Sequence, residues 1–384
     1  MVHVVDPKLC HQIAMDQQSF PKVPASQDSL FLRFLGKENM VVLNGPQWKK
    51  QSLIIRNAFS TSAPIHLFAS VSRNAIEVME AVPADDKKGH TLCWSDLTQR
   101  IALDAIGLGV MGYDYDSVRT ESPFMIEFST MMHEFVEPLY LVFPVLERWL
   151  PRKKVIARVV NFEKRLNGLL EMKRAEPGED IITKLATHPE LSSTEVKDNM
   201  ATLFFAGHDT SSSAMASVVY YLAVNKDAQN IARAEALRAF GRDSDPSLSS
   251  LGPQTLPYIH ACIKEALRLN PPASFASPRI SHQIATVWDE PHIFTPERFM
   301  GDSEVYQQNV KDIDPCMPFL VGPRHCPARD FALYELRTVL VMLLREYDWS
   351  LPAGSIHSKE IQNALSPFNT SMPRQLDITF TRHA

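Results

Sequence analysis

The chain has 384 residues, 45% of them hydrophobic and 22% charged, which argues against a disordered or fibrous protein. Its 39 basic and 44 acidic side chains give a net charge of −5, so nothing in the charge points to nucleic acid as a partner. Five scattered cysteines argue against a disulfide framework or structural zinc. Small-molecule chemistry is therefore the starting hypothesis.

The first residues and the hydropathy give no membrane signal. No stretch approaches the roughly 18 apolar residues that cross a bilayer. The start, from Met1 to Cys10, lacks the charged region and apolar core of a signal peptide. The sequence as written predicts a chain that is neither secreted nor anchored.

Helical periodicity dominates the middle of the chain, from about Leu97 to Tyr347. The strand pattern is confined to three short pieces, Val2–Val5, Met40–Leu43 and Leu376–Phe380. We find no internal repeat. The prediction is a mainly α fold with a small β component, in a single domain over residues 1–384.

One long helix is predicted from a capping box, Ser192 with Glu195, to about Asn225. At 1.5 Å per residue it is roughly 50 Å long, which is typical of a helix that crosses a large core. A polar insert interrupts its apolar turns. There, Gly207 weakens the helix and the Thr210 hydroxyl competes for a backbone carbonyl, so we expect a local distortion.

Two further helices follow. The first covers Pro257–Leu269, ends before two prolines, and places Glu265 and Arg268 on one face. The second begins after Cys326, with Pro327 near its first turn. Its apolar stripe predicts a buried face and consists of Leu333, Leu336, Leu340, Leu343 and Leu344.

The segment before that last helix carries the strongest chemical signal. Gly322 allows a tight loop, and the helix N-terminus after Cys326 favours a negative charge on its sulfur. Arg324 is placed to bind a carboxylate by a charge-assisted hydrogen bond. The alternative is a plain buried thiol. Since the Phe, Gly, Arg and Cys spacing arises by chance on the order of once in a thousand such chains, we favour a thiolate ligand of haem iron.

With these residues the chain resembles the cytochrome P450 family, from about Val5 to the C-terminus. The family carries Phe-x-x-Gly-x-Arg-x-Cys-x-Gly, matched by Phe319, Gly322, Arg324 and Cys326, while Ala328 replaces the last Gly. The resemblance implies that Cys326 is the axial metal ligand of haem b. It also implies that Phe319, Gly322 and Arg324 bind the cofactor.

Two other family motifs are present. Glu265 and Arg268 match Glu-x-x-Arg, and Arg298 in Pro296–Phe299 would complete a Glu-Arg-Arg network that we interpret as scaffold. Ala206 to Thr210 match Ala-Gly-x-Asp-Thr.

For this second motif the resemblance implies that Asp209 and Thr210 are catalytic residues that deliver protons, and that Ala206 lies at the cofactor. The alternative, a water-exposed helix face, is disfavoured by the apolar residues around them, Phe204, Phe205 and Val218–Leu222.

The chain departs from the family pattern in three places. It begins where the family's early helices are under way, so the anchor and first helix are predicted to be absent. Only eight residues separate Arg279 from Trp288, where relatives carry a longer segment. Ser52 stands four positions after Trp48, where an Arg commonly meets a haem propionate. The propionates are then expected to depend on Arg324, helped by Arg279 and Trp48.

The resemblance implies a monooxygenase that inserts one oxygen atom of O2 into a lipophilic organic substrate. Electrons come from NADPH through a separate NADPH–cytochrome reductase, which is expected to dock near the thiolate at Lys49, Lys50, Arg56 and Arg329. Phe204, Phe205 and Ala206 are candidates for the wall of an apolar substrate pocket.

The motifs resemble those of microsomal, fungal members of the family. This resemblance implies a role in fungal secondary metabolism and a location at the endoplasmic reticulum membrane. Without an anchor, a soluble protein is the alternative. Two alternatives remain open. One is a haem-thiolate isomerase, dehydratase or peroxide-using enzyme. The other is a non-catalytic remnant with impaired haem binding.

Overall fold

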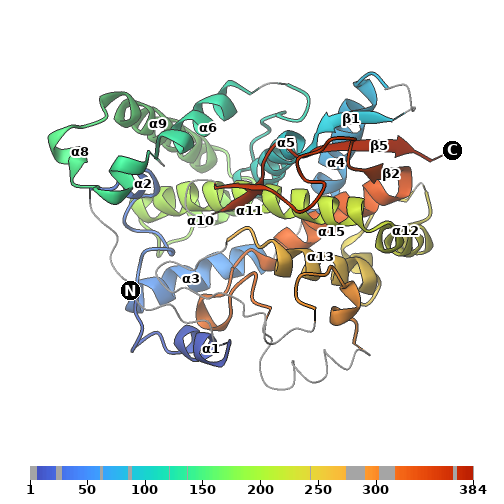
Figure 1. The fold of residues 1–384 in the computed structure, drawn as a ribbon. Helices are drawn as coiled ribbons and strands as arrows, with labels where there is room; N and C mark the ends of the chain where they lie inside the picture. The colour runs from blue at the N-terminus through green and yellow to red at the C-terminus, as the bar shows by residue number, and fades with distance from the viewer. Residues whose placement is uncertain are drawn as a thin grey trace.

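The structure is a computed structural model and describes residues 7–22, 28–60, 64–84, 89–120, 122–135, 137–242, 244–273, 290–301, 316–365 and 370–383. The larger helices in these ranges are α1 (Pro7–Met15), α2 (Leu30–Leu35), α3 (Gly45–Ser60), α4 (Ile65–Ala81), α5 (Trp94–Ile106), α6 (Pro123–Phe135), α9 (Lys153–Ala175), α10 (Ile181–Ala186), α11 (Ser193–Val224), α12 (Lys226–Phe240), α13 (Pro257–Leu269) and α15 (Arg329–Glu346). Short helical pieces are α7 (Pro138–Val142), α8 (Leu146–Trp149), η1 (Gly107–Met111), η2 (Leu248–Ser250), η4 (Pro296–Phe299) and η5 (Gly322–Arg324). The mainly α fold is confirmed (Figure 1).

The strands form two small antiparallel sheets. One has the order β1-β5-β2, from β1 (His90–Cys93), β5 (Asp377–Arg382) and β2 (Tyr347–Ser350). The other pairs β3 (Asn363–Leu365) with β4 (Ser371–Pro373). In the larger sheet Phe380 lies opposite both His90 and Trp349, and its side chain is fully buried.

Of the three predicted strands, one is confirmed. Leu376–Phe380 corresponds to β5. Met40–Leu43 was wrong, because the Asn39 side chain accepts hydrogen bonds from the backbone of Val41 and Val42, at 2.9 and 3.2 Å, and so closes a turn. Val2–Val5 lies outside the described residues.

The central helix α11 begins as its capping box predicts. The Glu195 backbone donates to Ser192 Oγ at 3.1 Å, and the Ser192 backbone donates to the Glu195 carboxylate at 2.8 Å. The helix crosses the whole molecule without interruption (Figure 1). A Cβ on Gly207 would lie 2.2 Å from Ile106 Cδ1, so this glycine lets α5 pack closely against α11. The expected hydroxyl bond of Thr210 is present without a break in the helix.

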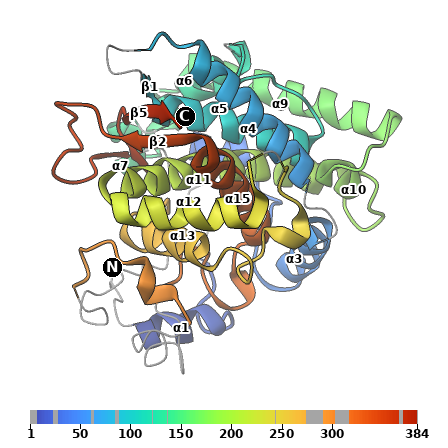
Figure 2. The ribbon, with the colours of Figure 1, turned by 90° about the vertical axis from the view of Figure 1, so that its right-hand side faces the viewer.

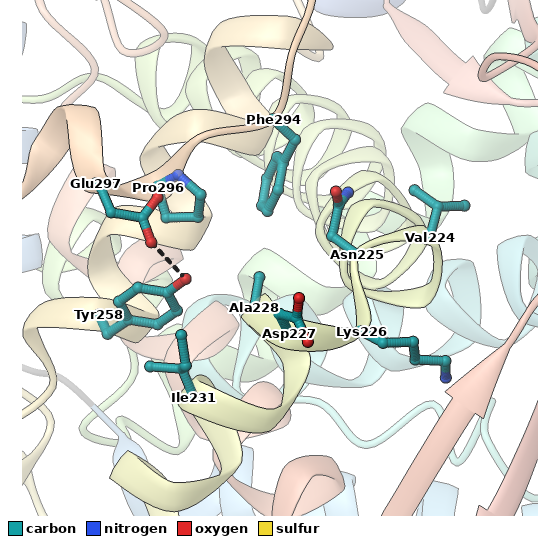
Figure 3. Close-up of a pocket in the computed structure, with 10 residues that line it drawn as sticks. All are labelled: Val224, Asn225, Lys226, Asp227, Ala228, Ile231, Tyr258, Phe294, Pro296 and Glu297. Carbon is teal, nitrogen blue, oxygen red and sulfur yellow. Dashed lines mark hydrogen bonds between the residues drawn. The ribbon is translucent and has the colours of Figure 1, made fainter.

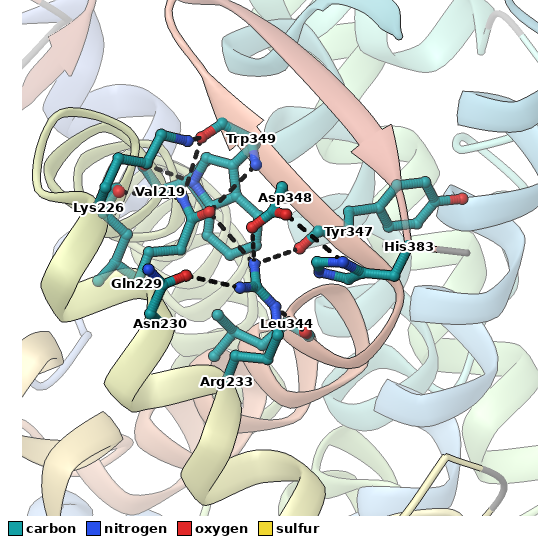
Figure 4. Close-up of polar contacts among 11 residues, drawn as sticks. Val219, Lys226, Gln229, Asn230, Arg233, Leu344, Tyr347, Asp348, Trp349 and His383 are labelled. Atoms are coloured by element: carbon teal, nitrogen blue, oxygen red, sulfur yellow. Dashed lines mark hydrogen bonds and ion pairs between the residues drawn. The ribbon is translucent and has the colours of Figure 1, made fainter. Parts of the chain in front are cut away.

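The C-terminal end of α15 is fixed by α12, which lies beside it (Figure 2). Arg233 Nε donates to the Leu344 carbonyl at 3.1 Å and Nη2 to the Tyr347 carbonyl at 3.0 Å, and the same guanidinium pairs with Asp348 (Figure 4). A cation at this end is favoured because the last carbonyls of a helix lack intrahelical partners. Gln229 adds a bond to the Trp349 backbone. The predicted leucine stripe of α15 is buried.

The predicted network of Glu265, Arg268 and Arg298 is present. Arg268 binds the Glu265 carboxylate through two nitrogens, at 2.7 and 2.9 Å, and Arg298 Nε lies 3.4 Å from the same group. All three side chains are buried. The Thr295 backbone also donates to Glu265 at 2.9 Å, so the network joins α13 to the segment that contains η4. Its role is structural.

Replacing Glu265 by Gln tests this role. We expect the free energy of unfolding to fall by about 3–5 kcal/mol, because the change leaves two buried guanidinium groups without their counter-charge. Urea unfolding followed by circular dichroism measures it. The control is Asp245→Asn, which breaks the exposed pair with Arg73 and is expected to change stability by less than about 1 kcal/mol. Equal effects of the two changes would contradict the role.

Candidate functional site

The loop that precedes α15 is closed by a backbone bond at Cys326. The Cys326 N–H donates to the Phe319 carbonyl at 2.8 Å. Within the loop, Leu320 and Gly322 both have left-handed backbone, with φ of 59° and 72°. For the leucine this conformation is strained, and such strain is characteristic of functional loops.

Gly322 has a second role besides allowing a tight loop. A Cβ at this position would lie 2.9 Å from Met15 Sδ and 3.0 Å from the Ala14 carbonyl, both in α1. The glycine therefore admits the N-terminal helix against the outside of the loop, in addition to supplying the positive φ.

Opposing effects act on the Cys326 thiol. Burial raises its pKa to about 11, while the backbone N–H of Ala328 and the nearby Arg329 act in the lowering direction. The N–H belongs to the residue just before α15, so the start of this helix faces the sulfur as expected. At neutral pH the thiol keeps its proton unless a cation stabilises the thiolate, which is the condition under which a metal binds cysteine.

Arg324 and Trp48 lie together. The Arg324 guanidinium is 4.3 Å from the centroid of the Trp48 ring. Its Nη2 donates to the Leu43 carbonyl at 2.9 Å and to Asn44 Oδ1 at 2.8 Å. Ser52 lies one helical turn after Trp48 on α3, and its buried hydroxyl has no partner within the described part of the chain. These groups form a polar corner beside the cysteine loop. Arg279 lies outside the described residues.

One stripe of α11 is open although most of the helix is buried. Ala206 is exposed, and Phe205, Gly207 and Thr210 are half-buried. On either side of these positions the helix is covered, since Phe204, His208 and Asp209 are buried. An exposed alanine in the middle of a central helix marks a face that the described chain does not fill. Ala206 and Thr210 are four residues apart and share this face.

The two predicted proton-delivering residues have different partners. Thr210 Oγ donates to the Ala206 carbonyl at 2.6 Å and stays on the open stripe. Asp209 is buried, and His208 Nδ1 lies 2.8 Å from its Oδ1. The acid and the alcohol are therefore each held by a separate contact.

Phe204 was wrongly placed in the wall of a substrate pocket. Its ring is fully buried and packs among four other aromatic rings, Tyr115, Phe124, Phe128 and Phe162. Residues 204 and 206 are about 200° apart around a helix, so both cannot face one pocket. Phe205 remains half-buried and meets Phe31 edge-on, at 5.4 Å between centroids.

Glu335 of α15 is a residue that sequence reasoning missed. Its side chain is 2% exposed, and Ser211 Oγ of α11 donates to its Oε2 at 2.8 Å. Burial raises its pKa to about 8, and the Ser211 bond acts in the lowering direction. The available signal was a lone acidic residue between Leu333 and Leu336 of the apolar stripe. This bond joins α15 to α11 one residue after Thr210.

These contacts fit a flat, largely apolar cofactor with acidic edges. Along α15, the helix start at Arg329 and the contact of Glu335 with Ser211 are about 9 Å apart. Cys326 lies in the loop just before this helix start. The open stripe of α11 ends at Thr210, one residue before Ser211. Trp48, Ser52 and Arg324 supply an aromatic face, an unpartnered hydroxyl and a cation for a carboxylate. A porphyrin bound through the sulfur of Cys326 is compatible with all of them.

Two surface cavities lie elsewhere. The first, of about 360 Å³, opens between the start of α12, α13 and η4, where Tyr258 donates to Glu297 at 3.0 Å (Figure 3). The second, of about 630 Å³, lies between the segment after η1 and α9 and includes Tyr115 and Arg165. None of the predicted site residues lines either cavity.

Known proteins are similar to this chain in sequence and in fold. A family model described as Cytochrome P450 matches residues 1–285 and 281–375. The chain is 32% identical over 212 residues to the cytochrome P450 monooxygenase cpaH of Aspergillus oryzae, a match that covers 49% of this chain and 40% of that protein. It is 27% identical to the chloroplastic cytochrome P450 97B1 of Pisum sativum, with 79% of this chain and 69% of that protein covered. A solved cytochrome P450, CYP102L1, shares the fold with a TM-score of 0.79 at 21% identity, over 100% of this chain and 89% of that one.

Glu335 gives a testable pH dependence. An unfolded glutamate ionises near pH 4.3, whereas the folded side chain holds its proton up to about 8. The stability of the protein is therefore expected to fall as the pH rises through this window, because only the unfolded state gains from ionisation. Glu335→Gln stays neutral throughout. The free energy of unfolding of this variant, relative to that of the wild type, is expected to rise by about 2–4 kcal/mol between pH 5 and pH 8.

Urea unfolding midpoints at pH 5, 6.5 and 8 measure this difference. Glu179→Gln, at an exposed position, serves as the control and is expected to follow the wild type. A constant difference between Glu335→Gln and the wild type would show that Glu335 ionises equally in both states.

Proposed function

Because the chain belongs to the cytochrome P450 family, we propose that it is a haem-thiolate monooxygenase that inserts one oxygen atom of O2 into a lipophilic organic substrate. The observation that carries the proposal is Cys326, held in a strained loop ahead of α15, the helix that Glu335 joins to α11. We propose that residues 1–384 act as one haem-binding unit. Activity is proposed for the whole protein, since the match to cpaH spans less than half of that relative.

Each site residue then has a defined task. Cys326 binds the iron of haem b, and Phe319 and Gly322 shape its loop. The haem supplies the activation of O2. Ala206 forms the part of α11 that approaches the ring, since a methyl group is the only side chain there.

The polar corner binds the acidic edge of the haem. Arg324 and Trp48 bind a propionate as hydrogen-bond donors, and the Ser52 hydroxyl and Arg279 assist them. Arg324 already bonds to the segment after α2, so propionate binding exchanges part of these contacts. Asp209 and Thr210 bring protons to the oxygen-binding side, Asp209 from the buried side of the helix and Thr210 from the open stripe.

Electrons are proposed to come from NADPH through a separate NADPH–cytochrome reductase. Of the four predicted docking cations, Lys50 pairs with Glu195 at 2.8 Å and Arg56 binds the Pro323 carbonyl. Both therefore support the protein itself. Lys49 and Arg329 are exposed, although Arg329 lies 3.2 Å from the exposed Asp330. These two are the better candidates for contact with an acidic partner, because an exposed ion pair is weak.

The rival haem-thiolate activities, isomerase, dehydratase or peroxide use, need no reductase. The presence of both Asp209 and Thr210 favours the monooxygenase, because proton delivery serves reductive activation of O2. A non-catalytic remnant remains the second rival. A dependence of the activity on reductase and NADPH distinguishes the monooxygenase from the first rival. The haem content of the purified protein distinguishes it from the second.

The absorbance spectrum of the reduced protein with carbon monoxide tests the proposal. The wild type is expected to give the red-shifted Soret band of thiolate-ligated haem, and Cys326→Ala is expected to lose it. Cys93→Ala is the control, because Cys93 lies on β1 and bonds to Ser95. A Cys326→Ala variant with an unchanged band, or a colourless wild type, would overturn the proposal.

We also propose a role in fungal secondary metabolism at the endoplasmic reticulum membrane. Support for the first is the similarity to the Aspergillus protein. No helix in the described ranges has both the length and the hydropathy to cross a bilayer. Support for membrane contact instead comes from exposed apolar side chains on and beside α7 and α8, of which α8 lies at the edge of the molecule in Figure 1. These side chains are 46–79% exposed and comprise Leu139, Val142, Phe143, Val145, Trp149 and Leu150.

Such a surface favours a lipid interface, because its aromatic and aliphatic groups are followed by the exposed Lys153 and Lys154. We expect the protein to float with vesicles of phosphatidylcholine and phosphatidylserine. Val142→Ser with Trp149→Ser is expected to reduce the bound fraction by about ten-fold, because two large apolar side chains leave the interface. Ile356→Ser, at an exposed position elsewhere, is the control. Absence of wild-type binding would favour the soluble alternative.

A further inference from the structure

His208 lies on the buried side of α11, away from the open stripe. His208 is only 2% exposed to solvent. The imidazole stacks on the Phe204 ring, at 6.5 Å between centroids and 5° between planes, and meets the Phe128 ring edge-on at 5.7 Å. Because residues two apart are about 200° apart around a helix, His208 and Ala206 face opposite directions.

One ring nitrogen of His208 forms a hydrogen bond with Asp209. Nδ1 lies 2.8 Å from Asp209 Oδ1, and since a carboxylate oxygen only accepts, the imidazole donates. Consecutive residues of a helix do not normally face each other, so this bond constrains both side chains. The other ring nitrogen, Nε2, is buried and has no partner within the described residues.

The buried Nε2 argues against a purely packing role. A phenylalanine would fill the same aromatic site without burying a polar nitrogen, and an unsatisfied buried nitrogen is destabilising. The imidazole therefore contributes something that a ring alone does not. What it contributes in this structure is one hydrogen bond to the carboxylate beside Thr210.

We propose that His208 is a positioning residue that fixes the direction of the Asp209 carboxylate for proton delivery. This inference rests on the proposed function, in which Asp209 and Thr210 carry the proton. Thr210 is held on the open stripe by its bond to Ala206. His208 holds the acid on the core side of the same turn, so that acid and alcohol keep one relative orientation.

Two substitutions separate the bond from the packing. His208→Phe keeps a ring between Phe128 and Phe204 and removes the donor, whereas His208→Asn keeps an N–H donor and removes the ring. The holoenzyme is supplied with NADPH, reductase and O2 alone, and peroxide and NADPH consumption are measured. His208→Phe is expected to raise the ratio of peroxide to water about ten-fold, as for the loss of one hydrogen bond to a charged group. His208→Asn is expected to stay within about three-fold of the wild type.

A second readout does not depend on activity. With ¹⁵N-labelled histidine, the His208 signal is assigned by its disappearance in His208→Phe. We expect a proton on Nδ1 that exchanges slowly with solvent in the wild type and rapidly in Asp209→Ala. An unprotonated Nδ1, or exchange that is unaffected by Asp209→Ala, would overturn the inference even if a variant fails to take up haem.

The outcomes separate the two proposals. A wild type without the thiolate-type spectrum would contradict the proposed function. The exchange measurement would still decide whether His208 holds Asp209. If all variants keep the spectrum and His208→Phe matches the wild type, the positioning role is wrong. It is equally wrong if His208→Phe and His208→Asn shift the peroxide ratio alike, because that result indicates packing.

Discussion

The hydrogen bond between Ser211 and Glu335 is the contact on which the arrangement of the site depends. It is the place where α11, with the open stripe, is tied to α15, whose loop carries Cys326. From that point the distance back to the cysteine loop is set by the rigid rise of α15. Arg233 fixes the other end of α15. A sulfur and a helix face far apart in sequence are therefore held at one separation.

The cysteine loop is also supported from outside. Gly322 leaves room for α1, and Arg324 reaches back to the segment between α2 and α3. Since Leu320 and Gly322 both require left-handed backbone, the loop is strained and needs this support. The helix α1 and the segment between α2 and α3 thus contribute to the site by supporting this loop. They hold the loop in a conformation that the loop alone does not favour.

The sequence predicts the helices that carry the site because their ends have local chemical causes. Ser192 with Glu195 sets the start of α11, and the prolines after Leu269 set the end of α13. Met40–Leu43 was misread because apolar alternation indicated a strand while the Asn39 side chain determined a turn. The positions of Arg324 and Ser52 depend on long-range contacts that no local pattern contains.

The residues that sequence reasoning missed share one physical property. Glu335 and His208 are polar groups inside apolar surroundings. Glu335 accepts a hydrogen bond from Ser211, and His208 bonds to Asp209, so both partners are direct neighbours of Thr210 in the chain. On a helix, an acidic or basic residue normally indicates the solvent-facing side, so a sequence pattern assigns such groups to the surface. Here they face the core because a buried partner is present. Buried polar groups of this kind weaken a core unless paired, and their concentration around one turn of α11 indicates that this turn is organised for more than packing.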